Sequence, residues 1–312
     1  MGILQIRKAQ REGAKMLIGF AGVSGSGKTY TALQFAYGLA NYDSSKIGLL
    51  DTENRRGSLY SDIIKDQSGI VQPFLIGDLY PPFSPARYIE AIKEFQAAGV
   101  QVLIIDSVTH EWEGEGGASE IAEKNLLGRQ PNWSLAKMHH KKFVNQLLLS
   151  DMHVIVCVRA REKTKPMKNS QGKTEFVDCG LQAIQEKNFM FEMTASLMME
   201  NEGRTPNVIK CPSDLQQYLG RGNGYITPED GKAVRDWVDG AKQLDPKTEA
   251  YRNKLQAITG QGLEHIKDCW RKTPLSIQES LGEEFKNQIF ASAKAYDEQE
   301  AQEQKSKKSQ TN

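Results

Sequence analysis

Long apolar runs, clustered cysteines and an excess of either charge are all missing from this chain of 312 residues. No apolar run reaches the ~18 residues that a membrane helix needs, so we expect no membrane segment. The four cysteines are far apart and form no CxxC pair, which argues against a disulfide scaffold and a zinc site. Lysine and arginine number 40 against 39 acidic residues, for a net charge of +1. A uniformly basic coat for nucleic acid is therefore excluded, and any anion-binding surface must be local.

Composition along the chain suggests four regions. Residues 1–15 lack the apolar core of a secretory signal, and scattered thiols are typical of a cytoplasmic protein. An α/β core is expected over residues 16–226, and a small helical domain over 227–297. The polar segment 298–312 has almost no large apolar residues and is expected to be disordered.

Short apolar runs alternate with helical patterns in the first two thirds of the chain, which predicts an α/β fold with a mostly parallel sheet covered on both faces. The expected strands cover residues 16–20, 47–50, 71–76, 100–105 and 153–158, and the expected helices cover 28–40, 85–98 and 133–149. Residues 189–199 and 207–211 resemble two strands without an intervening helix, so we expect an antiparallel extension. The C-terminal helices are expected near 228–241, 246–259, 262–271 and 275–297.

The most specific signal is GVSGSGKT at residues 22–29, which fits the phosphate-binding pattern GxxxxGK[ST] between a predicted strand and a predicted helix. Its glycines let backbone N–H groups surround phosphate oxygens, and the helix N-terminus adds a positive dipole end. Lys28 is expected to reach the β- and γ-phosphates of ATP, and the Thr29 hydroxyl to ligate Mg²⁺. A chance glycine-serine loop is the alternative, which the context disfavours. The predicted nucleotide-binding residues are Gly22, Val23, Ser24, Gly25, Ser26, Gly27, Lys28, Thr29 and Tyr30.

Two predicted strands end in acidic residues. The apolar strand VLIID delivers Asp106 to the sheet edge where phosphates bind, so we expect Asp106 to hold Mg²⁺. After the strand GLLD, Glu53 is our candidate for the carboxylate that orients the attacking water, and Asp51 is the second candidate. The alternatives are an ordinary strand-end aspartate and a polar turn that leads into residues 54–57.

Together these elements resemble RecA-type ATPases over about residues 16–215. Thr29, Glu53 and Asp106 match the family's motif positions in order. The segments 81–85 and 106–117 are more closely similar to phage-encoded RecA-like ATPases, including the Sak-type single-strand annealing branch. The resemblance implies a RecA-like P-loop core with ATP and Mg²⁺ as cofactors, Lys28 and Glu53 as catalytic residues, and a location in the cytoplasm of a bacterial host.

The resemblance also implies that two loops face single-stranded DNA. The second of them, residues 159–173, carries six cations and one acid, and such a loop can follow a phosphate backbone. A solvated, flexible loop is the alternative. In the acidic first loop, Trp112 is more simply a buried anchor than a base-stacking residue, and His110 more simply a structural hydrogen-bonding group. The predicted DNA-binding residues are Arg161, Lys163, Lys165, Lys168 and Lys173.

Oligomeric relatives complete the active site with a cation from the neighbouring subunit. Lys187, Arg204 and Lys210 lie in the corresponding region, and Lys210 is the preferred candidate. Arg159 or Arg161 is the alternative, as a phosphate sensor. The resemblance implies a homo-oligomer, either a ring or a filament, and the C-terminal helices are candidates for recruiting a single-strand-binding protein or a nuclease.

The leading hypothesis is a DNA-stimulated ATPase that acts on single-stranded DNA in phage recombination or repair, by annealing or strand exchange. The alternative is a nucleotide-gated adaptor or loader that binds a protein partner instead of DNA. A small-molecule kinase is a weaker third possibility: residues 159–173 resemble an arginine-rich lid, but a carboxylate at Glu53 suits the activation of water.

Overall fold

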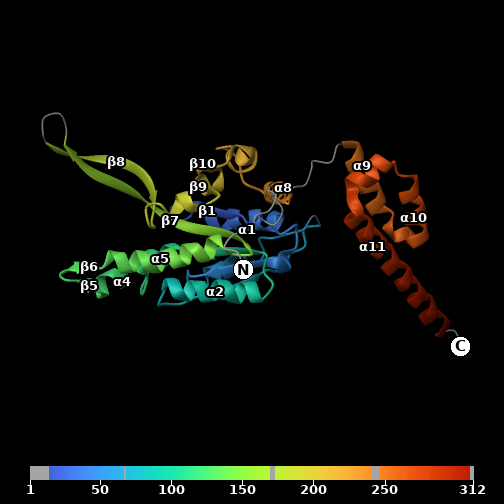
Figure 1. Ribbon diagram of the computed structural model, residues 1–312, viewed down its shortest axis with the longest axis horizontal. Helices are drawn as coiled ribbons and strands as arrows, with labels where there is room; N and C mark the ends of the chain where they lie inside the picture. Colours follow the sequence, from blue (N-terminus) through green and yellow to red (C-terminus); the bar gives the residue numbers. More distant parts are fainter. Residues whose placement is uncertain (1–13, 67, 169–172, 240–245, 310–312) are drawn as a thin grey trace, which may run out of the picture. The chain divides into compact units, whose positions relative to one another are not determined.

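The computed structural model describes residues 14–66, 68–168, 173–239 and 246–309 (Figure 1). The chain divides into two compact units, Met1–Gly240 and Ala241–Asn312. Among the described residues, no helix is both long and apolar enough to cross a membrane.

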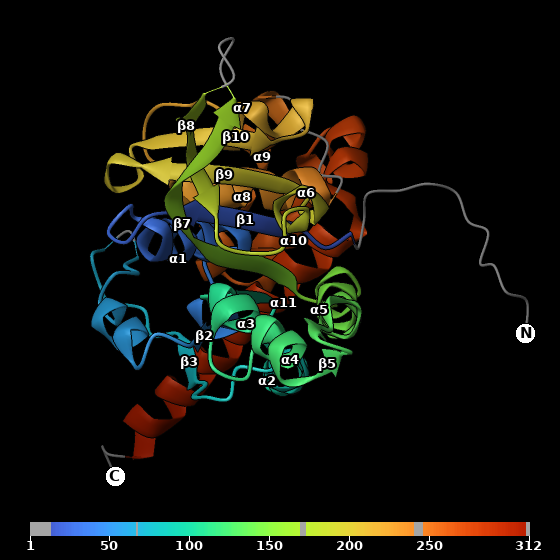
Figure 2. The ribbon, with the colours of Figure 1, turned by 90° about the vertical axis from the view of Figure 1, so that its left-hand side faces the viewer.

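The first unit is built on an eight-stranded sheet with the order β10-β9-β1-β7-β4-β2-β3, and β8 pairs with β7 outside this path. Five neighbouring pairs within this order are parallel, and β10 is antiparallel to β9, so the predicted antiparallel extension of a parallel sheet is confirmed. Figure 2 shows β9, β1 and β7 side by side. The strands are β1 (Leu17–Gly22), β2 (Ile47–Asp51), β3 (Leu75–Asp78), β4 (Val102–Asp106), β7 (His153–Lys168), β8 (Thr174–Ala183), β9 (Ala195–Glu200) and β10 (Thr205–Lys210).

Helices cover both faces of this sheet. Val102 and Ile104 of β4 belong to the core cluster that includes α1 and α8, whereas Leu103 and Ile105 belong to the cluster that includes α2 and α5. A strand buried on both faces has apolar side chains at every position, which is the reason for its continuous apolar sequence. The helices are α1 (Lys28–Leu39), α2 (Pro85–Ala97), α3 (Thr109–Glu113), α4 (Ala118–Lys124), α5 (Trp133–Leu148), α6 (Phe189–Glu192), α7 (Gln216–Leu219) and α8 (Pro228–Val238).

Short elements connect these helices and strands. A small hairpin, β5 (Leu126–Leu127) and β6 (Gln130–Pro131), precedes α5. The short 3₁₀ helices are η1 (Ser44–Lys46), η2 (Arg56–Tyr60), η3 (Asn201–Gly203) and η4 (Ser213–Leu215). The predicted strand over 189–199 is instead the helix α6 followed by β9, because the apolar run was too short to separate a buried helical turn from a strand.

The boundary between the α/β core and the C-terminal helices lies one helix later than the expected residue 226. α8 belongs to the first unit and packs tightly on α1: a Cβ atom on Gly38 would lie 1.7 Å from the Pro228 carbonyl oxygen, and one on Gly231 would lie 2.1 Å from the Phe35 carbonyl oxygen. Two glycines therefore allow the backbones to approach. This contact joins distant segments, so the local helix-start signal at Thr227 did not reveal it.

The predicted loop over residues 159–173 is also corrected. β7 continues to Lys168 and pairs with the antiparallel β8, and Figure 1 shows both strands projecting from the core as a two-stranded ribbon. Its side chains from Arg161 to Lys168 are exposed. Because neither face of this part of the ribbon is buried, its sequence has no apolar alternation from which a strand could be predicted.

The second unit has its own apolar core. It contains α9 (Pro246–Ala257), η5 (Thr259–Gln261), α10 (Leu263–Lys272) and α11 (Leu275–Ser309). Leu255, Ile266, Trp270, Phe285 and Ile289 form that core. α11 continues to Ser309, through most of the segment expected to be disordered, and the alanine, glutamate, glutamine and lysine residues there have high helix propensity.

Candidate nucleotide hydrolysis site

The phosphate-binding loop lies where the sequence predicts it, between β1 and α1. Gly25 and Gly27 have φ angles of +79° and +86°, which only glycine adopts without strain. The loop also packs against the β9–β10 turn, since a Cβ atom on Gly27 would lie 2.6 Å from the Glu202 carbonyl oxygen. Gly27 is the N-cap of α1 and provides no side-chain cap, so the first backbone N–H groups of α1 are available to an anion.

Lys28 lies over this loop. Its Nζ donates hydrogen bonds to the carbonyl oxygens of Gly22, at 3.0 Å, and Val23, at 2.8 Å. Burial lowers the pKa of Lys28 below its ordinary value of 10.5, and the nearby Asp106 and Glu53 carboxylates oppose that shift. The ammonium group is therefore held at the concave side of the loop, as its predicted role in phosphate binding requires.

Thr29 and Asp106 meet although 77 residues separate them. The Thr29 hydroxyl donates to Oδ2 of Asp106 at 2.5 Å. Asp106 ends β4, and burial raises the pKa of its carboxyl from 3.8 to about 6, against the opposing effect of the Thr29 hydrogen bond. A hydroxyl and a carboxylate are oxygen ligands of the kind that Mg²⁺ prefers.

The residues of the loop fit a magnesium nucleotide. The Ser26 hydroxyl is buried and has no hydrogen-bond partner among the described residues. The described residues contain no group of three or more His, Cys, Asp or Glu side chains that could hold a metal. The pocket beside the loop is lined by Ser24, Gly25, Lys28, Thr29, Leu49, Asp51, Glu53, Arg56, Gly57, Tyr60, Asp106 and Arg159.

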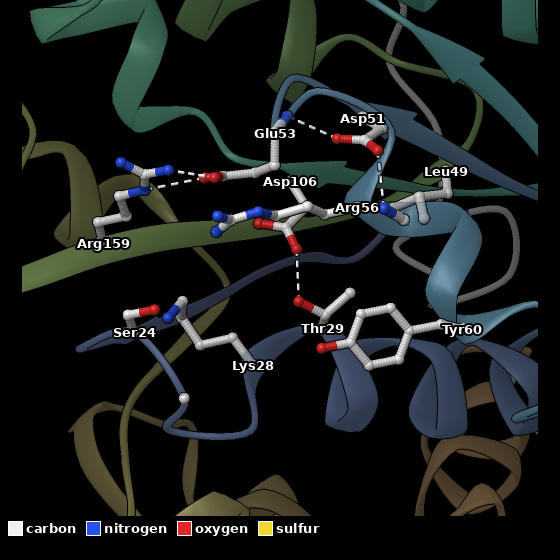
Figure 3. A pocket seen from close by; sticks show the side chains of 12 residues that line it. Ser24, Lys28, Thr29, Leu49, Asp51, Glu53, Arg56, Tyr60, Asp106 and Arg159 are labelled. Atoms are coloured by element: carbon white, nitrogen blue, oxygen red, sulfur yellow. Dashed lines mark hydrogen bonds and ion pairs between the residues drawn. The ribbon is translucent and has the colours of Figure 1, made fainter.

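Glu53 lies in this pocket and is paired with Arg159 (Figure 3). Nε of Arg159 donates to Oε1 of Glu53 at 2.8 Å, and the second guanidinium nitrogen contacts Oε2. Glu53 follows β2 and Arg159 belongs to β7, so the pair spans the end of β4, where Asp106 lies. A bidentate arginine–carboxylate pair fixes the orientation of both groups.

Asp51 has a different task. Its side chain is 2% exposed, and its two oxygens accept the backbone N–H groups of Glu53, at 2.5 Å, and Gly57, at 2.7 Å. Because Asp51 is buried whereas Glu53 is half-buried, this geometry favours Glu53 over Asp51 as the water-orienting carboxylate.

Four pocket residues are not among those predicted from the sequence: Leu49, Arg56, Gly57 and Tyr60. Arg56, Gly57 and Tyr60 belong to η2, which follows Glu53. The only sequence signal was their short distance from the two candidate carboxylates.

His110 and Trp112 have structural contacts. Nδ1 of His110 lies 2.8 Å from Oγ1 of Thr52, and burial lowers the pKa of His110. Trp112 stacks on Trp133, with ring centroids 6.4 Å apart, and packs against a small buried cluster of α4 and α5. Both contacts agree with the simpler interpretations of these residues.

The remaining predicted cations lie outside the pocket lining. Arg161 pairs with Glu113 at 3.1 Å, and Arg204 donates to the Tyr225 hydroxyl at 2.6 Å. Nζ of Lys210 donates to the carbonyl oxygens of Phe191 and Met193. The exposed cations at the ribbon and beyond it are Lys163, Lys165, Lys168, Lys173 and Lys187.

Fold and site together define an α/β P-loop nucleotide-binding protein. Residues 13–200 match the family described as an AAA domain. This match covers more than half of the chain, which therefore belongs to the AAA domain family. Among solved structures, a KaiC-like protein of the hyperthermophilic archaeon Pyrococcus horikoshii OT3 is similar at 17% identity with a TM-score of 0.36, over 61% of this chain and 72% of that chain. Curated proteins include no match.

Proposed function

We propose that the chain hydrolyses ATP to ADP and phosphate and acts on single-stranded DNA in phage recombination or repair, by annealing or strand exchange. The observation that carries this proposal is Arg159: it pairs with Glu53 in the nucleotide pocket and lies in β7, just before the exposed part of the β7–β8 ribbon begins. A group bound to the ribbon can therefore act on the hydrolytic carboxylate through a single side chain.

Five of the pocket residues act in the proposed hydrolysis: Lys28, Thr29, Glu53, Asp106 and Arg159. Lys28 and the N–H groups of the loop bind the phosphates, and Thr29 and Asp106 hold Mg²⁺. Bound Mg²⁺ supplies a positive charge that polarises the phosphoryl oxygens. Glu53 orients the attacking water, and Arg159 fixes the direction of that carboxylate.

The β7–β8 ribbon has the features of a surface that follows a nucleic-acid backbone. Arg161, Lys163 and Lys165 are exposed and follow one another along β7. Val177, which is opposite Lys165 in the ribbon, adds an exposed apolar side chain. Cations in a row beside apolar groups suit a single strand, whose phosphates and bases they can both contact.

The proposal is tested by the ATPase rate with and without single-stranded DNA. The double variant Lys163→Glu/Lys165→Glu is expected to keep basal hydrolysis and lose DNA stimulation. The same charge change at Lys141 and Lys142, two exposed residues of α5, is the matched control and is expected to keep it. The double variant also loses two phosphate contacts. The slope of log K for DNA binding against log salt concentration is therefore expected to become shallower by about 1.4.

Hydrolysis that does not respond to DNA would contradict this proposal and favour a nucleotide-gated adaptor. The second unit supports that alternative, because α9–α11 form a compact unit with their own core, as a protein-binding module would. Its partner would be a single-strand-binding protein or a nuclease, and binding would require ATP.

A homo-oligomer, either a ring or a filament, remains part of the proposal. Lys210 and Arg204 both donate hydrogen bonds to groups of their own chain. A role for either residue in a neighbouring subunit's site would require these bonds to be exchanged.

A further inference from the structure

We propose that Arg56 is a catalytic residue that acts within its own chain, by neutralising charge on the γ-phosphate during hydrolysis. The inference rests on the proposed hydrolysis of ATP. Arg56 is the first residue of η2 and lines the pocket together with Lys28, Glu53 and Asp106. Figure 3 shows its side chain extending into the pocket, toward the side where Lys28 and Arg159 lie.

The loop after β2 is built to aim this side chain. The Asp51 carboxylate holds both ends of the loop through Glu53 and Gly57. Between them, Asn54 and Arg55 have φ angles of 57° and 67°, a left-handed backbone that turns the chain sharply. Gly57 lies close to β2, because a Cβ atom there would be 2.7 Å from the Leu49 side chain and 3.1 Å from Asp51.

The two adjacent arginines consequently have different partners. Both are exposed, but Arg55 pairs with Asp78 on β3, at 3.4 Å, and does not line the pocket. Arg56 lines the pocket, and no described residue forms an ion pair or a hydrogen bond with its guanidinium group. Sequence position alone does not distinguish the two.

The other cations of the pocket already have partners. Arg159 is engaged with Glu53, and Lys28 donates to carbonyl oxygens of the loop. Arg56 is thus the pocket cation whose donors are all available, and its five N–H groups suit the oxygens of a phosphoryl group. Its placement within the same chain means that the site carries this charge without a neighbouring subunit.

The step in which Arg56 acts is the attack of water on the γ-phosphorus. A bond forms between the water oxygen and the γ-phosphorus, and the bond to the β–γ bridging oxygen breaks. The bridging oxygen leaves on ADP with the electron pair, and a water proton moves toward the Glu53 carboxylate. Negative charge shifts over the phosphoryl oxygens in this transition state, and a cation that contacts them stabilises it more than it stabilises bound ATP.

The test compares Arg56→Ala with Arg55→Ala, the adjacent and equally charged control. We expect Arg56→Ala to lower kcat by about 10²- to 10³-fold, with little change in the Kd of Mg-ATP measured with a fluorescent ATP analogue. Arg56→Lys is expected to recover part of kcat, and Arg55→Ala to stay close to the wild-type rate. Retained ATP binding shows that the variant is folded.

A mixing experiment separates action within the chain from action across an interface. Lys28→Ala cannot bind phosphate productively, so an equal mixture of Lys28→Ala and Arg56→Ala stays inactive if Arg56 serves its own pocket. Recovery of hydrolysis in the mixture would overturn the assignment, as would an equal loss of ATP affinity in Arg56→Ala. Absence of hydrolysis by the wild type would refute the proposed ATPase, whereas wild-type rates in Arg56→Ala would refute the role of Arg56 alone.

Discussion

Replacing Asp106 with asparagine is expected to stabilise the first unit while it removes the carboxylate that we propose as a magnesium ligand. The reason is the pKa of Asp106, which burial raises from 3.8 to about 6. A carboxyl with a raised pKa contributes stability below pH 3.8, and this contribution is lost as the pH rises through 6. At neutral pH the fold therefore contains a charge that burial disfavours.

The size of this effect follows from the shift. A difference of about two pKa units at 1.36 kcal/mol each corresponds to about 3 kcal/mol. This value is an upper limit, because Asp106 is only half-buried and solvent weakens the penalty for its charge. Asparagine retains an oxygen that can accept the hydrogen bond from Thr29.

The assay is urea unfolding of wild type and Asp106→Asn without Mg²⁺ at pH 7.5 and pH 4. The free energy of unfolding of Asp106→Asn is expected to exceed that of wild type by about 1–3 kcal/mol at pH 7.5, and by almost nothing at pH 4. Asp51→Asn is the control at the aligned position of β2, and it is expected to lose stability because an amide cannot accept both backbone N–H groups. An Asp106→Asn protein that is no more stable than wild type at pH 7.5, or equally stabilised at both pH values, would refute the reasoning.

Two further predictions concern the fold of the first unit. Gly38→Ala is expected to lower the free energy of unfolding in urea by about 1–3 kcal/mol, because its Cβ atom would collide with the α8 backbone. An unchanged unfolding midpoint would show that α8 does not pack there. Burial lowers the pKa of His153 from 6.5 to about 4, and its Nδ1 accepts the Met16 N–H. Stability from the neutral ring is thus complete above pH 6.5 and is lost as the pH falls through 4, so acid titration of unfolding should show this loss in wild type but not in His153→Gln.

The local parts of the site could be predicted from the sequence. The loop of residues 22–29 binds phosphate with consecutive backbone groups, so its pattern is contiguous in the chain. The position of Asp106 could be predicted because an apolar strand must deliver its last residue to the edge of the sheet. The parallel sheet followed from the same apolar runs.

The parts that were missed depend on contacts between distant segments. The ribbon of β7 and β8 has no buried face beyond its base, so periodicity gave no signal. The packing of α8 on α1 requires Gly38 and Gly231 to face each other, which no local pattern reports. Arg56 could not be separated from Arg55, since the left-handed turn that directs them is held by the Asp51 carboxylate.

The phosphate loop, the strand-end carboxylates and the α/β class could be inferred from local patterns, because each depends on neighbouring residues and on the period of apolar side chains. The combination of charged groups in the pocket depends on the folded core. Glu53 and Arg159 are 106 residues apart, and they meet because the strand order β7-β4-β2 brings their strand ends to one edge around Asp106. Strand order is set by the packing of the whole sheet between its helices, so this pairing is a property of the folded core rather than of any segment.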